Sequence, residues 1–128
     1  MSPQIVPEEP PVVTVVDASD DTIALELDGE FDMDAAPELL EHAERALQAG
    51  KNLIVNLSDA TFIDFMIVHT LFRAEERAAG AGRVLILQFG TDAAVERVLS
   101  ITGADARLET APTREQALER IRERKISS

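Results

Sequence analysis

Two short apolar runs, separated by a segment with helical periodicity, constrain the fold of this chain most strongly. NLIVNL (52–57) and VLILQF (84–89) contain no charged residue and are nearly continuous apolar runs, which is typical of strands covered on both faces of a parallel sheet. Between them, residues 65–79 carry apolar residues at helical spacing, and the Gly-Ala-Gly of residues 80–82 ends that helix. A strand, a helix and a second strand of these lengths predict a right-handed crossover between parallel neighbours.

Flanking segments extend the same pattern. VVTVV (12–16) and TIALEL (22–27) are rich in β-formers and are joined by the turn sequence DASDD, which predicts an antiparallel pair at the start of the sheet. ARLET (106–110) is a candidate short strand. Helical spacing of apolar residues predicts three further helices, within 30–50, 91–103 and 113–125. These elements predict a single α/β domain over residues 12–126, with a mixed, mainly parallel β-sheet and about four α-helices.

Polar residues and glycines mark where these helices should begin and end. Asp34 is a candidate cap for the first helix, and Pro37 fits only in its first turn. Gly103 suits the exit of the third helix. Thr113 and Gln116 have the spacing of a capping box at the start of the last helix.

The N-terminal half of the chain is strongly acidic. Residues 1–64 hold 15 acidic and 2 basic residues, whereas residues 65–128 hold 9 and 10, so the net charge of −12 divides into −13 and +1. Such a field repels phosphate backbones and anionic headgroups, which argues against nucleic acid and membrane surfaces as partners and favours a basic protein. The alternative, that the acidity only keeps the protein soluble, stays open.

The first eleven residues stand apart from the predicted domain. They contain four of the six prolines together with Glu8 and Glu9, and so predict a flexible N-terminal arm. No apolar run reaches the length of a membrane span and no secretory signal pattern occurs, which predicts a cytoplasmic protein. The lack of cysteine excludes disulfides and thiolate chemistry within the chain.

Little in the sequence points to catalysis. His42 and His69 fall in predicted helices outside any two-histidine metal motif, and we interpret them as ordinary helix residues. No phosphate-binding loop, dinucleotide fingerprint or nucleophile elbow occurs, so we predict no enzyme activity, no metal and no cofactor. A phosphoreceiver domain shares the order of strands and helices, but it needs a lysine after its last strand, and neither Lys51 nor Lys125 follows a late strand.

Five pieces of sequence stand in a recognisable order: GEFD (29–32), LIVNLSDATFID (53–64), AAGAGRVLIL (78–87), VERVLSITGAD (95–105) and TREQALERI (113–121). Together they resemble the STAS family, the domain shared by anti-sigma factor antagonists and the cytosolic parts of sulfate transporters. The resemblance extends from about Val12 to Arg124 and agrees with the order of elements derived above. It implies a small α/β domain whose loop after the third strand, with the following helix start, docks on a partner.

The same resemblance shows where this chain departs from the family. In anti-sigma factor antagonists an ATP-binding kinase, which also sequesters a sigma factor, phosphorylates a serine in an Asp-Ser-Ser/Thr-Gly-Leu motif, and the modified antagonist releases it. Here the aspartate matches Asp64, the hydroxyl positions are Phe65 and Met66, the glycine is Ile67 and the leucine is Val68. Phe65 and Met66 therefore form a degenerate phosphosite. The loss of glycine at Ile67 also suggests that a partner's backbone packs less closely there.

The predicted docking site joins this helix start to the acidic loop before the first helix. It comprises Glu30, Asp32, Asp34, Asp64, Phe65, Met66, Ile67 and Val68. The predicted function is a non-enzymatic regulatory module that binds an anti-sigma factor or a related ATP-binding kinase-like protein, without phosphorylation at the family position.

Several alternatives remain open at the level of sequence. Phe65 and Met66 could be exposed contacts or part of the core, because the letters are the same in both cases. A displaced phosphosite at Ser58, Thr61 or Thr70 and self-association of the chain are further alternatives. In a competing reading, the domain is ligand-sensing or transport-associated, and the same apolar residues line a pocket for a small molecule or lipid.

Overall fold

The structure, a computed structural model, describes residues 10–127, and the side chains of residues 10–124. The predicted N-terminal arm therefore lies outside the described residues, except for Pro10 and Pro11, which are exposed and precede the first strand. No helix in the described part of the chain is long and apolar enough to pass through a membrane.

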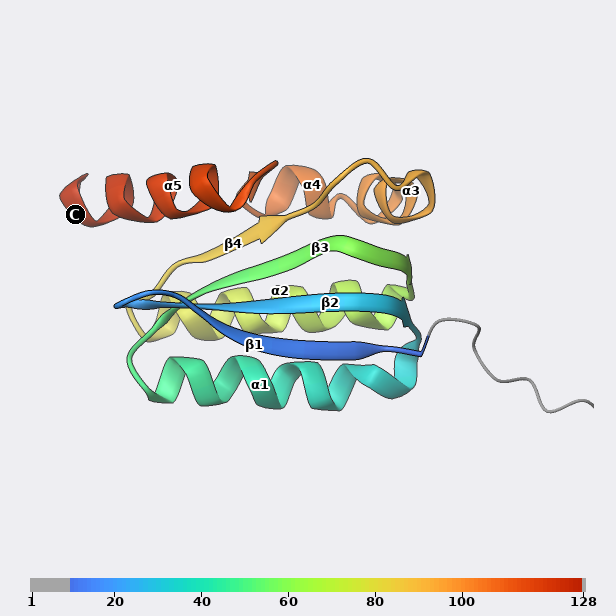
Figure 1. Ribbon diagram of the computed structural model, residues 1–128, viewed down its shortest axis with the longest axis horizontal. Coiled ribbons are helices and arrows are strands. Elements are labelled where there is room, and N and C mark those ends of the chain that lie inside the picture. The colour runs from blue at the N-terminus through green and yellow to red at the C-terminus, as the bar shows by residue number, and fades with distance from the viewer. Residues whose placement is uncertain (1–9, 128) are drawn as a thin grey trace, which may run out of the picture.

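Strands and helices alternate along the described residues (Figure 1). The strands are β1 (Val12–Ser19), β2 (Thr22–Phe31), β3 (Asn52–Ile63), β4 (Leu85–Gln88) and β5 (Thr110–Ala111). The helices are α1 (Ala36–Gln48), α2 (Phe65–Gly80), α3 (Ala93–Thr102), α4 (Ala104–Arg107) and α5 (Arg114–Ser127). A single 3-10 turn, η1 (Met33–Ala35), precedes α1.

The strands form one mixed sheet in the order β1-β2-β3-β4-β5. β1 lies antiparallel to β2, whereas β2 with β3, β3 with β4, and β4 with β5 are parallel pairs. Every parallel connection passes through at least one helix, as parallel neighbours require. The predicted α/β class, with its antiparallel first pair and mainly parallel sheet, is confirmed.

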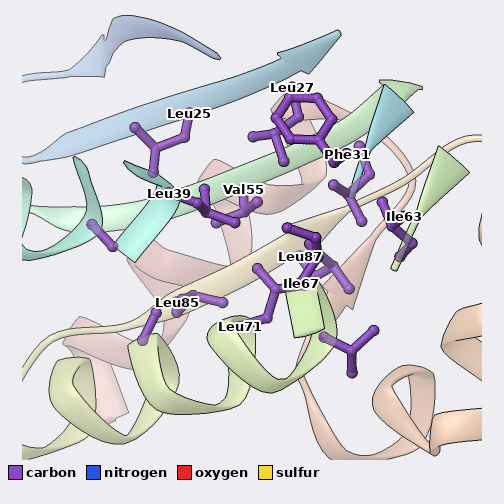
Figure 2. Packing of buried hydrophobic residues seen from close by; sticks show 14 of the residues in the cluster. Leu25, Leu27, Phe31, Leu39, Val55, Ile63, Ile67, Leu71, Leu85 and Leu87 are labelled. Carbon is purple, nitrogen blue, oxygen red and sulfur yellow. The ribbon is translucent and has the colours of Figure 1, made fainter. Parts of the chain in front are cut away.

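Successive residues of the central strands point to opposite faces of the sheet, and both faces are covered. One face packs against α1, α2 and α3 through a cluster that includes Leu25, Leu39, Val55, Leu71 and Leu87 (Figure 2). The other face packs against α5 through Ala24, Ile54, Ile86, Ala117 and Ile121. This burial on both faces explains why the sequences of β3 and β4 are apolar almost without interruption.

β3 continues to Ile63, well beyond the predicted end at Leu57. Its second half pairs with the second half of β2, and the register shifts there by β-bulges. The bulges break the alternation of buried and exposed residues, so that only Ala60 and Ile63 are buried between residues 58 and 63. The apolar run therefore ends although the strand does not.

The predicted strand over residues 106–110 is wrong in its first part. Ala104–Arg107 form α4, a fifth helix where about four were predicted, and only Thr110–Ala111 pair with β4. Gly103, with φ 78°, ends α3 as predicted, and its carbonyl oxygen accepts the N–H of Arg107 at 2.9 Å. The chain thus enters a new helical turn at once, and this turn buries Ala104.

Of the two predicted helix caps, Thr113 is confirmed and Asp34 is wrong. Thr113 Oγ1 accepts the N–H of Gln116 at 3.1 Å, as the capping-box spacing predicted. Asp34 does not cap a helix. Instead Asp32 Oδ1 accepts the N–H of Asp34 at 3.0 Å and caps η1, because the 3-10 turn begins two residues earlier than the predicted helix.

Alanine substitutions at two glycines test the backbone conformation at the α3–α4 junction. Gly103 has a positive φ that L-residues adopt at a cost of about 1–2 kcal/mol, whereas Gly80 ends α2 with no positive φ and no atom within 4 Å of an added Cβ. We expect Gly103→Ala to lower the free energy of unfolding by about 1–2 kcal/mol and Gly80→Ala to raise it by about 0.5–1 kcal/mol. Urea unfolding followed by circular dichroism measures both. Equal effects of the two substitutions on the free energy of unfolding would show that Gly103 does not have a positive φ at the α3–α4 junction.

Candidate functional site

The carboxyl ends of β2 and β3 meet the start of α2 at one edge of the sheet. Glu30 and Phe31 of β2 lie beside Phe62 and Ile63 of β3. The N–H of Asp64 donates to the carbonyl oxygen of Phe31 at 2.9 Å, and η1 packs against α2. Segments that are separate in sequence, 28–35 and 58–66, therefore form one surface.

Asp64 starts α2. Its backbone is extended, at φ −82° and ψ 159°, and its carboxylate Oδ1 accepts the N–H of Met66 at 2.8 Å. This is the usual N-cap arrangement, which satisfies one of the unpaired N–H groups of the first turn. Phe65 and Met66 are consequently the first two residues of the helix, and their positions are fixed by the cap.

Large apolar side chains are unusually exposed at this edge. The described residues include seven exposed large apolar side chains, and four of them lie here: Met33 (60%), Phe62 (40%), Phe65 (60%) and Met66 (44%). We call these four residues the apolar patch. Scattered exposed apolar residues need no explanation, but a group at one edge indicates a binding surface. The open question about Phe65 and Met66 is settled in favour of exposure.

Ile67 and Val68 require a correction. They were predicted to be part of the docking site, but they are 0% and 1% exposed and pack in the core with Leu71 (Figure 2 labels Ile67 and Leu71). Helical geometry places residues 67, 68 and 71 on the side facing the sheet, while residues 65 and 66 face away. Because the Ile67 side chain points inward, it also does not obstruct a partner, contrary to the sequence-based suggestion.

Six carboxylates lie on the same two segments as the apolar patch. Asp28, Asp32, Asp34 and Asp59 are exposed, and Glu30 and Asp64 are half-buried. We call these six residues the acidic rim. Within the described part of the chain none of them forms an ion pair, and no lysine or arginine occurs between residues 22 and 44 or between 52 and 72.

Asp28 and Asp59 lie opposite each other in the β2–β3 register, although like charges on paired strands are destabilising. Elsewhere some acidic side chains do lie in ion pairs, as with Glu44 and Arg77 between α1 and α2, or Glu26 and Arg114 between β2 and α5. The rim is therefore a surface whose charge the fold leaves unbalanced, and it is suited to a basic partner.

The alternative hydroxyl groups near the patch differ in accessibility. Ser58 and Thr61 are exposed, with the N–H of Ser58 donating to Asn56 Oδ1 at 2.9 Å. Thr70 is only 5% exposed, and its Oγ1 donates to the carbonyl oxygen of Met66 at 2.8 Å. Thr70 is therefore buried in the folded chain, whereas Ser58 and Thr61 have exposed side chains.

The two histidines differ in their relation to this surface. His42 is half-buried in α1, with Nε2 3.5 Å from Glu38 Oε1, whereas His69 is exposed in α2, one helical turn after Phe65 and Met66. No group of three or more acidic or histidine residues suited to a metal ion occurs among the described residues. The edge of the sheet thus combines exposed apolar side chains with carboxylates that form no ion pair among the described residues, a combination suited to a contact surface.

Met33 and Phe62 belong to the apolar patch but were not predicted from the sequence. Met33 stands between two aspartates in EFDMD, where an apolar residue after a strand end was the only available signal. Phe62 lies in the part of β3 that was not predicted as strand. Recognising that β3 runs to Ile63 would have placed Phe62 beside Glu30 and hence on the surface.

Comparison with known proteins identifies the class. The model of the STAS domain matches residues 14–117, and the chain belongs to the STAS domain family. A search of curated proteins finds no significant match.

Solved structures share the fold at low sequence identity. An anti-sigma factor antagonist from Mycobacterium paratuberculosis is 23% identical, with a TM-score of 0.78 over 88% of this chain and 95% of its own. The Thermotoga maritima protein TM1081 is 24% identical, with a TM-score of 0.72 over 87% and 93%. The Bacillus cell fate determinant SpoIIAA in its phosphorylated form is 20% identical, with a TM-score of 0.66 over 86% and 99%.

Neighbouring residues of α2 test the division between surface and core. Ile67→Ala empties a fully buried position, and we expect it to lower the free energy of unfolding by about 2–5 kcal/mol. Met66→Ala removes an exposed side chain, and we expect a change within about 0.5 kcal/mol. Chemical denaturation of the two variants beside the wild type measures the difference. A loss at Met66 as large as that at Ile67 would show that the patch is core.

Proposed function

We propose that this STAS domain is a regulatory binding module of the anti-sigma factor antagonist type, which docks on an anti-sigma factor or a related ATP-binding kinase-like protein. The observation that carries the proposal is the exposure of Phe65 and Met66 directly after the cap residue Asp64. The family resemblance implies docking at this helix start, and a mycobacterial neighbour is named as an anti-sigma factor antagonist.

The apolar patch and the acidic rim have separate parts in the proposed docking. Aromatic and methionine side chains in the centre of an interface supply most of the binding free energy once water is excluded. Full burial of one such side chain contributes roughly 1.5–3 kcal/mol. The unpaired carboxylates of the rim attract a basic partner over a distance of about 8–10 Å at physiological salt and mainly raise the association rate.

Docking in this proposal is not controlled by phosphate at the family position. Neither Phe65 nor Met66 has a hydroxyl group, and the remaining motif positions, Ile67 and Val68, are buried apolar residues. The domain acts by binding rather than by catalysis, and it stays competent to bind where a family member with serine would be released. We place it in the cytoplasm, where such a partner would act.

The ligand-sensing alternative finds no specific support at this surface. A cavity of about 270 Å³ lies between α2, β4, α4 and α5, and its lining includes Arg83, Arg107 and Arg124. None of its lining residues belongs to the apolar patch. The patch itself consists of outward-facing side chains at a sheet edge and a helix start, which suits a macromolecular partner better than an enclosed small molecule.

Substitution of Phe65 tests the docking site. We expect Phe65→Asp to weaken capture of the partner roughly thirtyfold or more, corresponding to loss of an interface centre worth about 2 kcal/mol. Ile101→Asp is the matched control, because Ile101 is also an exposed apolar helix residue, at 68%, but lies outside the patch. Affinity capture from a lysate of the native cells, with mass spectrometry, identifies the partner. Equal capture by both variants and the wild type would refute the site.

Restoring hydroxyl groups at positions 65 and 66 tests whether their loss is what prevents phosphorylation at the family position. We expect the double variant Phe65→Ser/Met66→Ser to be phosphorylated when it is incubated with the captured kinase-like protein and ATP, because both hydroxyl positions of the motif then follow Asp64. The wild-type chain serves as the control. Phosphopeptide mapping locates the phosphate, and phosphate on Ser58 or Thr61 of the wild type would show instead that the site has moved within the chain.

A further inference from the structure

The sulfur atoms of this chain are concentrated in the apolar patch. The chain contains no cysteine and three methionines, at positions 1, 33 and 66. Of these, Met33 and Met66 are described, and both belong to the patch, with 60% and 44% of their surfaces exposed. Oxidants that react with protein sulfur therefore meet the proposed docking surface whenever it is free.

We propose that Met33 and Met66 form a reversible oxidation site that controls docking at the apolar patch. The inference rests on the proposed function, because the surface that oxidation changes is the surface that binds. In each event hydrogen peroxide transfers one oxygen atom to the thioether. The sulfur loses two electrons and forms an S–O bond, the O–O bond of hydrogen peroxide breaks, and water leaves.

The reverse reaction needs an external thiol, because the chain has none. A methionine sulfoxide reductase of each stereochemical type removes the oxygen as water, and two thiols of the reductant become a disulfide. Both side chains are exposed in the free protein, so oxidant and reductase have access to them. A docked partner would cover the same side chains and protect them.

Oxidation changes the binding surface without disturbing the fold. The N–H of Met66 donates to Asp64 Oδ1, and the carbonyl oxygen of Met66 accepts a hydrogen bond from the Thr70 hydroxyl. Neither hydrogen bond involves the sulfur atom. Neighbouring Ile67 holds the helix in the core. A sulfoxide is polar and chiral, and burying its oxygen in an apolar contact without a donor is unfavourable. Met66 also occupies one of the two family phosphoacceptor positions.

The chemical part of the inference is tested on the full chain without a partner. Purified protein is treated with hydrogen peroxide, and the oxygen is located by peptide mass spectrometry beside N-acetylmethionine amide. We expect both methionines to react at rates close to that of the model compound, the melting temperature to stay unchanged, and the two reductases with dithiothreitol to restore the thioethers. Resistance of both side chains, or unfolding upon oxidation, overturns the proposal.

The regulatory part is tested with the partner that the Phe65→Asp variant fails to capture. We expect oxidation to weaken binding by the wild type at least tenfold and reductase treatment to restore it. The Met33→Leu/Met66→Leu variant has no sulfur in the patch, and we expect its affinity, whatever its value before treatment, to be the same after treatment. Undiminished binding by oxidised wild type overturns the oxidation site while leaving the docking proposal intact. If Phe65→Asp binds as well as wild type, the docking proposal fails, and the oxidation site fails with it.

Discussion

The candidate surface depends on the hydrogen bonds of one residue, Asp64. Its N–H binds the carbonyl oxygen of Phe31, its carboxylate binds the N–H of Met66, and its carbonyl oxygen accepts the N–H of Ile67 at 2.9 Å. These bonds join the end of β2, the end of β3 and the start of α2 into one corner. Once the helix starts at Phe65, its period sends the first two side chains outward and the next two into the core. The exposure of Phe65 and Met66 is thus a consequence of where the cap lies.

The corner between β2, β3 and α2 is stabilised by core residues that do not belong to the apolar patch. Ile63, Ile67 and Val68 are buried beneath it, and the sheet is closed on its other face by α5. The surface above can therefore keep features that weaken a fold, such as exposed aromatic and methionine side chains and the opposed pair Asp28 and Asp59. Functional sites are expected to contain residues that lower stability within an otherwise well-packed fold.

The central strands could be predicted from the sequence, whereas the end of β3 and helix α4 could not. NLIVNL and VLILQF identified the two central parallel strands, because burial on both faces leaves a continuous apolar run. The end of β3 was missed since bulges disturb its alternation, and α4 was taken for strand since four residues are too few to show a period. Asp64 could be matched to the aspartate of the family motif, but the same kind of apolar residue stands in the core at position 67 and on the surface at position 66. Only the direction of the helix relative to the sheet separates them.

The departure from the family motif changes the kind of control this surface can use. A phosphate would add nearly two negative charges to a rim that already holds six carboxylates, and such a change acts mostly on the attraction of a basic partner. The substitutions at positions 65 and 66 place apolar side chains there instead, in the part of an interface that contributes most to affinity. Affinity then depends on how apolar the patch remains. Ile67, buried where the family has glycine, binds the helix start to the core and keeps the patch in place whatever its chemical state. In the proposed function, control at this surface acts on the apolar side chains themselves, and of the apolar residues in the patch only the methionines have a reversible chemistry.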